Sequence, residues 1–216
     1  MEMKTFAKNN DRDFTRTLSK TKVSGFTLVE TLVAISIFSV SILSLMSVLA
    51  NGIANTSYAK EKMIATYLAQ EGIEYMRNLR DTHMLYDDSS GNSNGWQKFN
   101  DQLTGPLGIP SCNATNDSSH SCYFDDQSVD YTNPTKPIEN ITITPCGTAC
   151  PELLYKSSTG RYNYDSSGTP SGYTRKIQMT HIPGSDETKI FSTVFWTQGS
   201  GSHSVTLSET LFNWIE

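Results

Sequence analysis

The chain has 216 residues and a formal net charge of −5, a length that suits one ordinary globular domain with an additional anchor. Residues 1–25 contain six basic and three acidic side chains, a net charge of +3, so the remaining residues carry −8. The negative charge of the residues after 25 argues against broad nucleic-acid binding, which depends on clustered Lys and Arg side chains that neutralise phosphates.

A long apolar segment begins at Phe26, directly after these basic residues, and continues to about residue 49. About 24 apolar residues are enough for a helix to cross the roughly 30 Å hydrocarbon core of a bilayer. Basic residues before the segment predict that this end is cytoplasmic and that the chain after Ala54 lies outside. Glu30 is the one charged residue in the segment, and it requires a partner because a carboxylate there costs about 2.5 to 3.5 kcal/mol.

Three interpretations of the apolar segment remain open. A secretory signal peptide would be cleaved after it, near Ala50 or Ala54, but such peptides have shorter apolar cores and no glutamate. An ordinary signal anchor explains the length and the flanking charge, but neither Glu30 nor the glycine before the segment. Cleavage between Gly25 and Phe26 would instead create a free amine, which could pair with Glu30 of a neighbouring copy inside the membrane.

Residues 24–35, SGFTLVETLVAI, resemble the prepilin class III signal of type IV pilins and type II secretion pseudopilins. In that family a prepilin peptidase cleaves after the glycine and N-methylates the new first residue. The resemblance implies cleavage between Gly25 and Phe26, methylation of Phe26 and a role for Glu30 in assembly. It also implies contacts with the prepilin peptidase, with membrane lipid, with other pilin or pseudopilin subunits and with an inner-membrane assembly platform.

The same resemblance implies that the chain is a structural subunit without enzymatic activity. It would be a single-pass inner-membrane protein with a cytoplasmic N-terminus and a periplasmic or extracellular ectodomain, before it enters a pilus or pseudopilus. Many major pilins have a proline at the position of Ser47, and this chain has none before Pro106, which favours a minor pilin or pseudopilin. The alternative is a membrane-anchored cell-surface binding module that does not polymerise, with residues 87–135 forming its site.

Residues 58–80 continue the helical pattern beyond the apolar segment. Apolar side chains recur there at spacings of three, four or seven residues and form one stripe, which consists of Ile64, Tyr67, Leu68, Tyr75, Met76 and Leu79. Gly72 interrupts the stripe, at a cost of roughly 1 kcal/mol relative to alanine. An unbroken helix over residues 26–80 would be roughly 80 Å long, and residues 50–55 are the place where it could bend or fray.

Residues 87–135 have the composition of loops, rich in Asp, Ser, Asn, Gly and Pro. We expect Trp96, Phe99, Leu103 and Leu107 to dock a short helix or ordered loop onto the core. Residues 87–92 offer oxygen ligands for calcium but lack the spacing of an EF-hand, so we expect a solvated loop there.

All four cysteines follow the apolar segment, at positions 112, 122, 146 and 150. An even number beyond a membrane segment favours disulfides in an oxidising compartment, with buried free thiols as the alternative. Of the three possible connectivities we favour the local one, Cys112 with Cys122 and Cys146 with Cys150. A zinc site that also recruits His120 matches no common zinc motif.

The last third of the chain is predicted to form an antiparallel sheet. Residues 173–182 alternate, with Tyr173, Ile177 and Met179 on one face, and residues 189–198 and 202–212 are also strand-like. A further hairpin is expected at residues 153–155 and 161–164, and a candidate strand at 138–144. These elements predict an α+β fold in which the long N-terminal helix packs on a C-terminal antiparallel β-sheet, as in pilins.

These boundaries divide the chain into four parts. We expect a basic prepilin leader at 1–25, a transmembrane and assembly helix at 26–54, the ectodomain half of the long helix at 55–86, and a loop-rich β-sheet ectodomain at 87–216. The four histidines are isolated, and no nucleophile elbow, His-Glu-x-x-His or phosphate loop is present, so we predict no catalytic site, metal or cofactor. Nucleic-acid binding by this subunit is not expected, although four basic residues could still cluster: Arg161, Arg175, Lys176 and Lys189.

Overall fold

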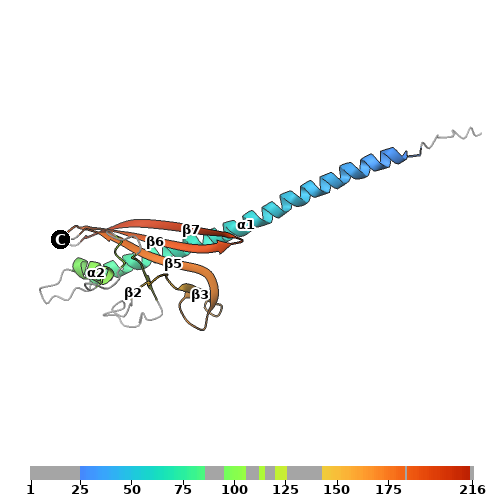
Figure 1. Cartoon of the computed structure of the whole chain (residues 1–216). Coiled ribbons are helices and arrows are strands. Elements are labelled where there is room, and N and C mark those ends of the chain that lie inside the picture. Colours follow the sequence, from blue (N-terminus) through green and yellow to red (C-terminus); the bar gives the residue numbers. More distant parts are fainter. Residues whose placement is uncertain are drawn as a thin grey trace, which may run out of the picture. The chain divides into compact units, whose positions relative to one another are not determined.

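The computed structural model describes residues 25–85, 95–105, 112–114, 120–125, 143–182 and 184–214 (Figure 1). Its helices are α1 (Leu28–Leu85) and α2 (Gly95–Thr104). Its strands are β1 (Cys122–Phe124), β2 (Ile143–Pro145), β3 (Glu152–Lys156), β4 (Arg161–Asn163), β5 (Thr169–His181), β6 (Glu187–Gln198) and β7 (Gly201–Phe212). The predicted α+β fold, a long N-terminal helix followed by an antiparallel sheet, is therefore confirmed.

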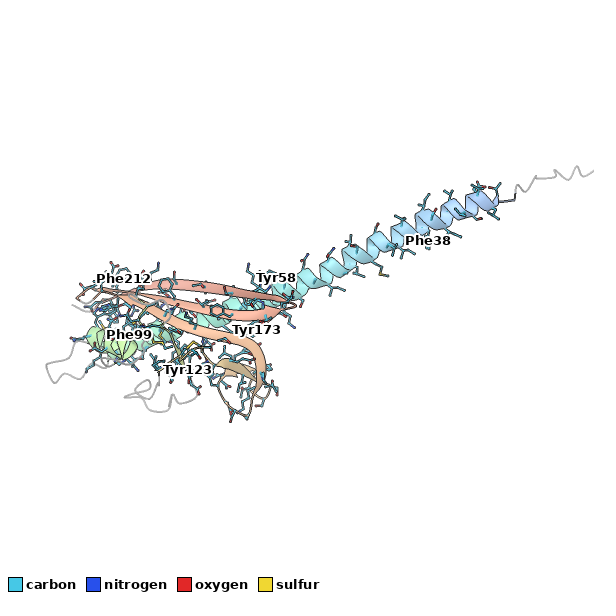
Figure 2. The ribbon with its side chains drawn as sticks, viewed as in Figure 1. Phe38, Tyr58, Phe99, Tyr123, Tyr173 and Phe212 are labelled. Carbon is cyan, nitrogen blue, oxygen red and sulfur yellow. A yellow bond between two sulfur atoms is a disulfide. The ribbon has the colours of Figure 1, made fainter. Side chains whose placement is uncertain are left out.

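The chain divides into two compact units, one that ends at Asn51 and one that begins at Gly52, and α1 contributes residues to both. In the first unit the described side chains are exposed around the whole helix, and Phe38 projects away from it with 65% of its surface exposed (Figure 2). The apolar part of α1 has a mean hydropathy of 2.4 over 18 residues, and its length and composition suffice to cross a membrane. Residues 50–55, where we expected a bend or fraying, are helical.

Four hydroxyl groups of the apolar segment, those of Thr31, Ser36, Ser39 and Ser41, donate to carbonyls of the helix itself. Ser39 Oγ donates to the carbonyl of Ile35 and Ser41 Oγ to that of Ile37, each at 2.8 Å. Such bonds to the preceding turn remove the need for water, which a bilayer core cannot supply.

The second unit is built on a seven-stranded antiparallel sheet. Strands β5, β6 and β7 form a meander, and the other edge of β5 pairs with β1 and β3, which continue to β2 and β4. One face of the meander is buried, because alternate residues of β5 and β6 such as Ile177, Met179 and Ile190 are inaccessible. Helix α1 covers this face (Figure 1). Helix α2 adds Trp96, Phe99 and Leu103 to the same core.

The structure confirms the position of the apolar stripe predicted on α1, but the prediction was wrong for Tyr67. Leu68, Met76 and Leu79 are buried against the sheet, whereas Tyr67 is 65% exposed. The buried stripe also contains residues with little or no side chain, Ala65, Ala69 and Gly72. Small residues carry little apolar signal in a sequence, yet they allow the backbone of the helix to approach the sheet closely.

Two other expectations differ from the structure in detail. The loop-like region 87–135 contains a strand, β1, which is three residues long and is ordered by pairing with β2 and β5. The strand expected at 138–144 is present from Ile143, and residues 138–142 lie outside the described residues. The candidate calcium loop at 87–92 and Leu107 also lie outside them.

At Gly72 the backbone of α1 closely approaches the sheet. A Cβ atom added there would lie 2.3 Å from Ser192 Oγ and 3.0 Å from Ile177 Cδ1. Gly72→Ala is therefore expected to destabilise the second unit by about 1–3 kcal/mol through overpacking, despite the roughly 1 kcal/mol gain in helix propensity. Urea unfolding followed by circular dichroism measures the change.

Ser192→Ala provides the matched compensating change for Gly72→Ala. The Ser192 hydroxyl oxygen is buried without a hydrogen-bond partner among the described residues, so its removal alone is expected to cost little. The double variant should recover part of the lost stability, because the shortest contact disappears. A single Gly72→Ala variant more stable than the wild type would show that propensity outweighs packing here.

Candidate processing and assembly site at the start of α1

Residues Gly25, Phe26 and Thr27 precede α1 and have no regular secondary structure. All three are exposed, and Phe26 has 78% of its surface accessible. The peptide bond between Gly25 and Phe26 therefore lies in open backbone, two residues before the first helical residue, Leu28. A protease can reach a bond of this kind without first unwinding a helix.

Thr27 and Glu30 form a capping box at the start of the helix. The Thr27 hydroxyl oxygen accepts a hydrogen bond from the Glu30 backbone N–H at 3.3 Å, and Glu30 Oε2 accepts from the Thr27 backbone N–H at 3.4 Å. Two N–H groups that the helix cannot satisfy are thereby bonded reciprocally. The carboxylate also lies in the first turn, where the helix dipole favours negative charge.

Glu30 has no ion pair among the residues that the structure describes, and its side-chain hydrogen bonds within this part of the chain all involve Thr27. Its side chain is exposed on the apolar helix. The site therefore consists of an accessible Gly25–Phe26 bond and, one helical turn away, a carboxylate held by a neutral threonine. The sequence analysis assigned Glu30 a role in assembly and did not predict this cap. The signal for it is the Thr-x-x-Glu spacing of a capping box, which is present in the sequence.

The cysteines form two local disulfides, Cys112 with Cys122 and Cys146 with Cys150. Because Cys112 and Cys122 are bonded to each other, they are not available as zinc ligands. His120 Nδ1 instead lies 3.2 Å from the carbonyl oxygen of Asn113.

The four basic residues that could have clustered do not share a surface. Arg175 lies on the buried face of β5 and is 3% exposed, whereas Lys176 and Lys189 lie on the opposite face of the sheet. Arg161 belongs to β4, on the hairpin away from the meander. The described part of the second unit therefore presents no basic patch built from all four side chains.

Residues 20–46 match the family model of the prokaryotic N-terminal methylation motif. The chain carries the prepilin signature of type IV pilins and pseudopilins. No curated protein and no solved structure matches the chain. The prepilin motif supports a pilin-like or pseudopilin precursor, implies processing by a prepilin peptidase and assembly with other pilin subunits, and fits an anchor in the inner membrane.

Proposed function

We propose that this chain is a structural subunit, a minor pilin or pseudopilin, that is cleaved after Gly25, N-methylated on Phe26 and assembled through Glu30. The observation that carries the proposal is the prepilin motif at residues 20–46, placed where an accessible peptide bond precedes a capped apolar helix. Residues 26–54 would remain in the membrane with the N-terminal side cytoplasmic, and the ectodomain would face the periplasm or the exterior.

The capping box supports a two-stage role for Glu30. Before assembly, the carboxylate is held by Thr27 within its own chain. Cleavage creates an ammonium group on Phe26, and the same group on a neighbouring copy offers Glu30 a charged partner in place of neutral donors. The Thr27 donors carry no net charge, whereas an ammonium adds the Coulombic attraction of an opposite charge, which is strong in a low-dielectric membrane, so the exchange favours association. Position 47, which lies within α1, holds serine where many major pilins have proline, and this supports a minor rather than a major subunit.

Mass spectrometry of the mature protein tests the cleavage. We expect a chain that begins at Phe26 and carries one methyl group on its amine. A mature chain that begins at Met1, or near Asn51 or Asn55, would contradict the proposal, since these termini indicate a simple anchor or a signal peptide.

Gly25→Val is the matched variant for this test. A Cβ atom at Gly25 meets no other atom within 4 Å, so the substitution disturbs no contact of the described chain. We expect the variant to keep residues 1–25, because the peptidase would no longer find glycine before the scissile bond. Normal cleavage of this variant would mean that the protease reads another feature.

A further inference from the structure

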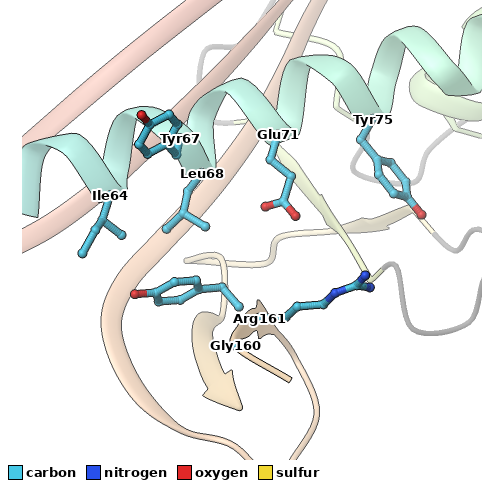
Figure 3. Close-up of a pocket in the computed structure, with 8 residues that line it drawn as sticks. Ile64, Tyr67, Leu68, Glu71, Tyr75, Gly160 and Arg161 are labelled. Atoms are coloured by element: carbon cyan, nitrogen blue, oxygen red, sulfur yellow. The ribbon is translucent and has the colours of Figure 1, made fainter. Parts of the chain in front are cut away.

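An open cavity of about 570 Å³ lies between α1 and the turn of the β3–β4 hairpin, within the second unit (Figure 3). Ile64, Leu68, Glu71 and Tyr75 project from α1 toward the hairpin, which contributes Arg161 (Figure 3). Gly160 and Tyr162 complete that side of the cavity, and Tyr67 lines it from α1. The volume lies within the range of small-molecule sites in proteins, roughly 300–1,000 Å³.

The aromatic wall of the cavity is held in place by its neighbours. The Tyr162 ring is perpendicular to that of Tyr173, with 6.0 Å between centroids, and tilted against that of Tyr155 at 5.1 Å. Burial raises the pKa of Tyr162, and the neighbouring Tyr155 contributes to the same shift. Tyr162 is therefore a neutral and positioned ring, to which the buried side chain of Leu68 adds an apolar floor.

The polar groups of the cavity leave one positive charge unbalanced. Glu71 Oε2 accepts a hydrogen bond from Arg175 Nη1 at 2.7 Å, so these two charges offset each other. The second oxygen of Glu71 has no bond among the described residues and remains an acceptor. The side chain of Arg161 is exposed and has neither an ion pair nor a hydrogen bond to the described part of the chain. Its planar guanidinium offers five donors in a fork that matches a carboxylate.

We propose that this cavity binds a saccharide that carries a carboxylate group. The guanidinium of Arg161 would hold the carboxylate, Glu71 would accept a bond from a sugar hydroxyl, and the apolar face of the sugar ring would lie against Tyr162. An acidic peptide could also satisfy Arg161. An extended peptide, however, commonly binds by adding a strand to a sheet edge, and β4 offers three residues for such pairing. The cavity therefore suits a compact ring better than a peptide chain.

Binding of digalacturonic acid to the full-length protein in detergent micelles tests this proposal, with neutral digalactose as the matched probe. Isothermal titration calorimetry should detect saturable binding of digalacturonic acid and at least tenfold weaker binding of digalactose. Arg161→Gln should weaken digalacturonic acid binding at least tenfold, and Arg161→Lys should weaken it less, because lysine keeps the charge without the fork. Lys189→Gln removes an exposed charge from the far face of the sheet and should change nothing.

Arg161 is exposed, so its replacement leaves no buried group unpaired, and near-ultraviolet circular dichroism should stay unchanged. No saturable binding of digalacturonic acid to the wild type up to about 10 mM would overturn the proposal. Equal binding of digalactose, or an Arg161→Gln variant that binds as the wild type does, would also overturn it. Tighter binding of an acetylated tetraglutamate peptide than of the sugar would assign the cavity to an acidic peptide instead. None of these outcomes depends on cleavage after Gly25.

Discussion

Glu30→Ala is expected to leave insertion of the chain into the membrane intact and to abolish its assembly with other subunits. Insertion should not suffer, because the substitution removes a carboxylate that costs about 2.5 to 3.5 kcal/mol in an apolar helix. Assembly should fail, because the ammonium of Phe26 on a neighbouring copy would lose its partner, and breaking a buried ion pair costs about 3–5 kcal/mol. Carbonate extraction of membranes measures insertion, and crosslinking between residues 26–54 of adjacent subunits measures assembly.

The capping box requires two further variants, because Glu30→Ala removes both a cap and a charge. Glu30→Gln keeps a side-chain oxygen that can accept from the Thr27 N–H, since glutamine also suits this position of a capping box. Thr27→Val removes the cap and keeps the charge. We expect Glu30→Gln to fail in assembly as Glu30→Ala does, and Thr27→Val to assemble, because a cap contributes about 0.5–2 kcal/mol.

The opposite pattern would reassign Glu30. If Glu30→Gln assembles normally while Thr27→Val does not, the carboxylate acts by ordering the first turn of its own helix, and the proposed pair with Phe26 is wrong. If both variants assemble normally, neither the charge nor the cap is needed for this subunit, as could hold for one placed at the end of a filament.

The fold was predictable where the signal is local and repeats along the chain. Residues 173–182 alternate apolar and polar side chains, and β5 accordingly buries Tyr173, Ile177 and Met179 on one face. Trp96, Phe99 and Leu103 recur at helical spacing, and α2 places all three in the core. In both elements one face must leave water, and the periodicity of the backbone determines which residues share that face.

Features that depend on contacts between distant segments were not predictable in this way. Strand β1 is too short to show a period and exists because β2 and β5 pair with it. In the sequence, Gly72 predicts a loss of helix stability. In the structure, the absence of a side chain at Gly72 makes room for Ser192. Arg175 is charged and so was left out of the buried face of β5, although the structure places it there. Its burial depends on Glu71, which is 104 residues away in the chain.

Arg175 is the one charged residue among the buried residues that the structure describes in the second unit. Its guanidinium lies 4.2 Å from the centre of the Phe124 ring, and Phe124 stacks on Tyr75 at 3.9 Å. Its side chain is 4% exposed, whereas that of its partner Glu71 is 45% exposed. The two members of this ion pair are therefore not equivalent, because water can solvate Glu71 alone but not Arg175 alone.

Glu71→Gln is consequently expected to destabilise the protein more than Arg175→Met. Glutamine keeps a neutral acceptor but leaves a buried cation without a counter-charge, at a cost of about 3 kcal/mol. Methionine removes that cation, fills much of its space, and leaves a half-exposed carboxylate to the solvent. Replacing buried ion pairs by apolar side chains is often close to neutral, so we expect a loss of about 1 kcal/mol or less for Arg175→Met. Urea unfolding of the full chain in detergent, followed by near-ultraviolet circular dichroism, measures both losses.

Glu74→Gln is the matched control, because Glu74 lies on the same helix and pairs at the surface with Arg77. Its loss should be within about 0.5 kcal/mol. The double variant Glu71→Gln with Arg175→Met should be more stable than Glu71→Gln alone, since the unpaired cation is gone. If Arg175→Met instead costs as much as Glu71→Gln and the double variant recovers nothing, the stacking of the guanidinium on Phe124 governs stability at this position. The charge of Glu71 would then matter mainly to the cavity that it lines.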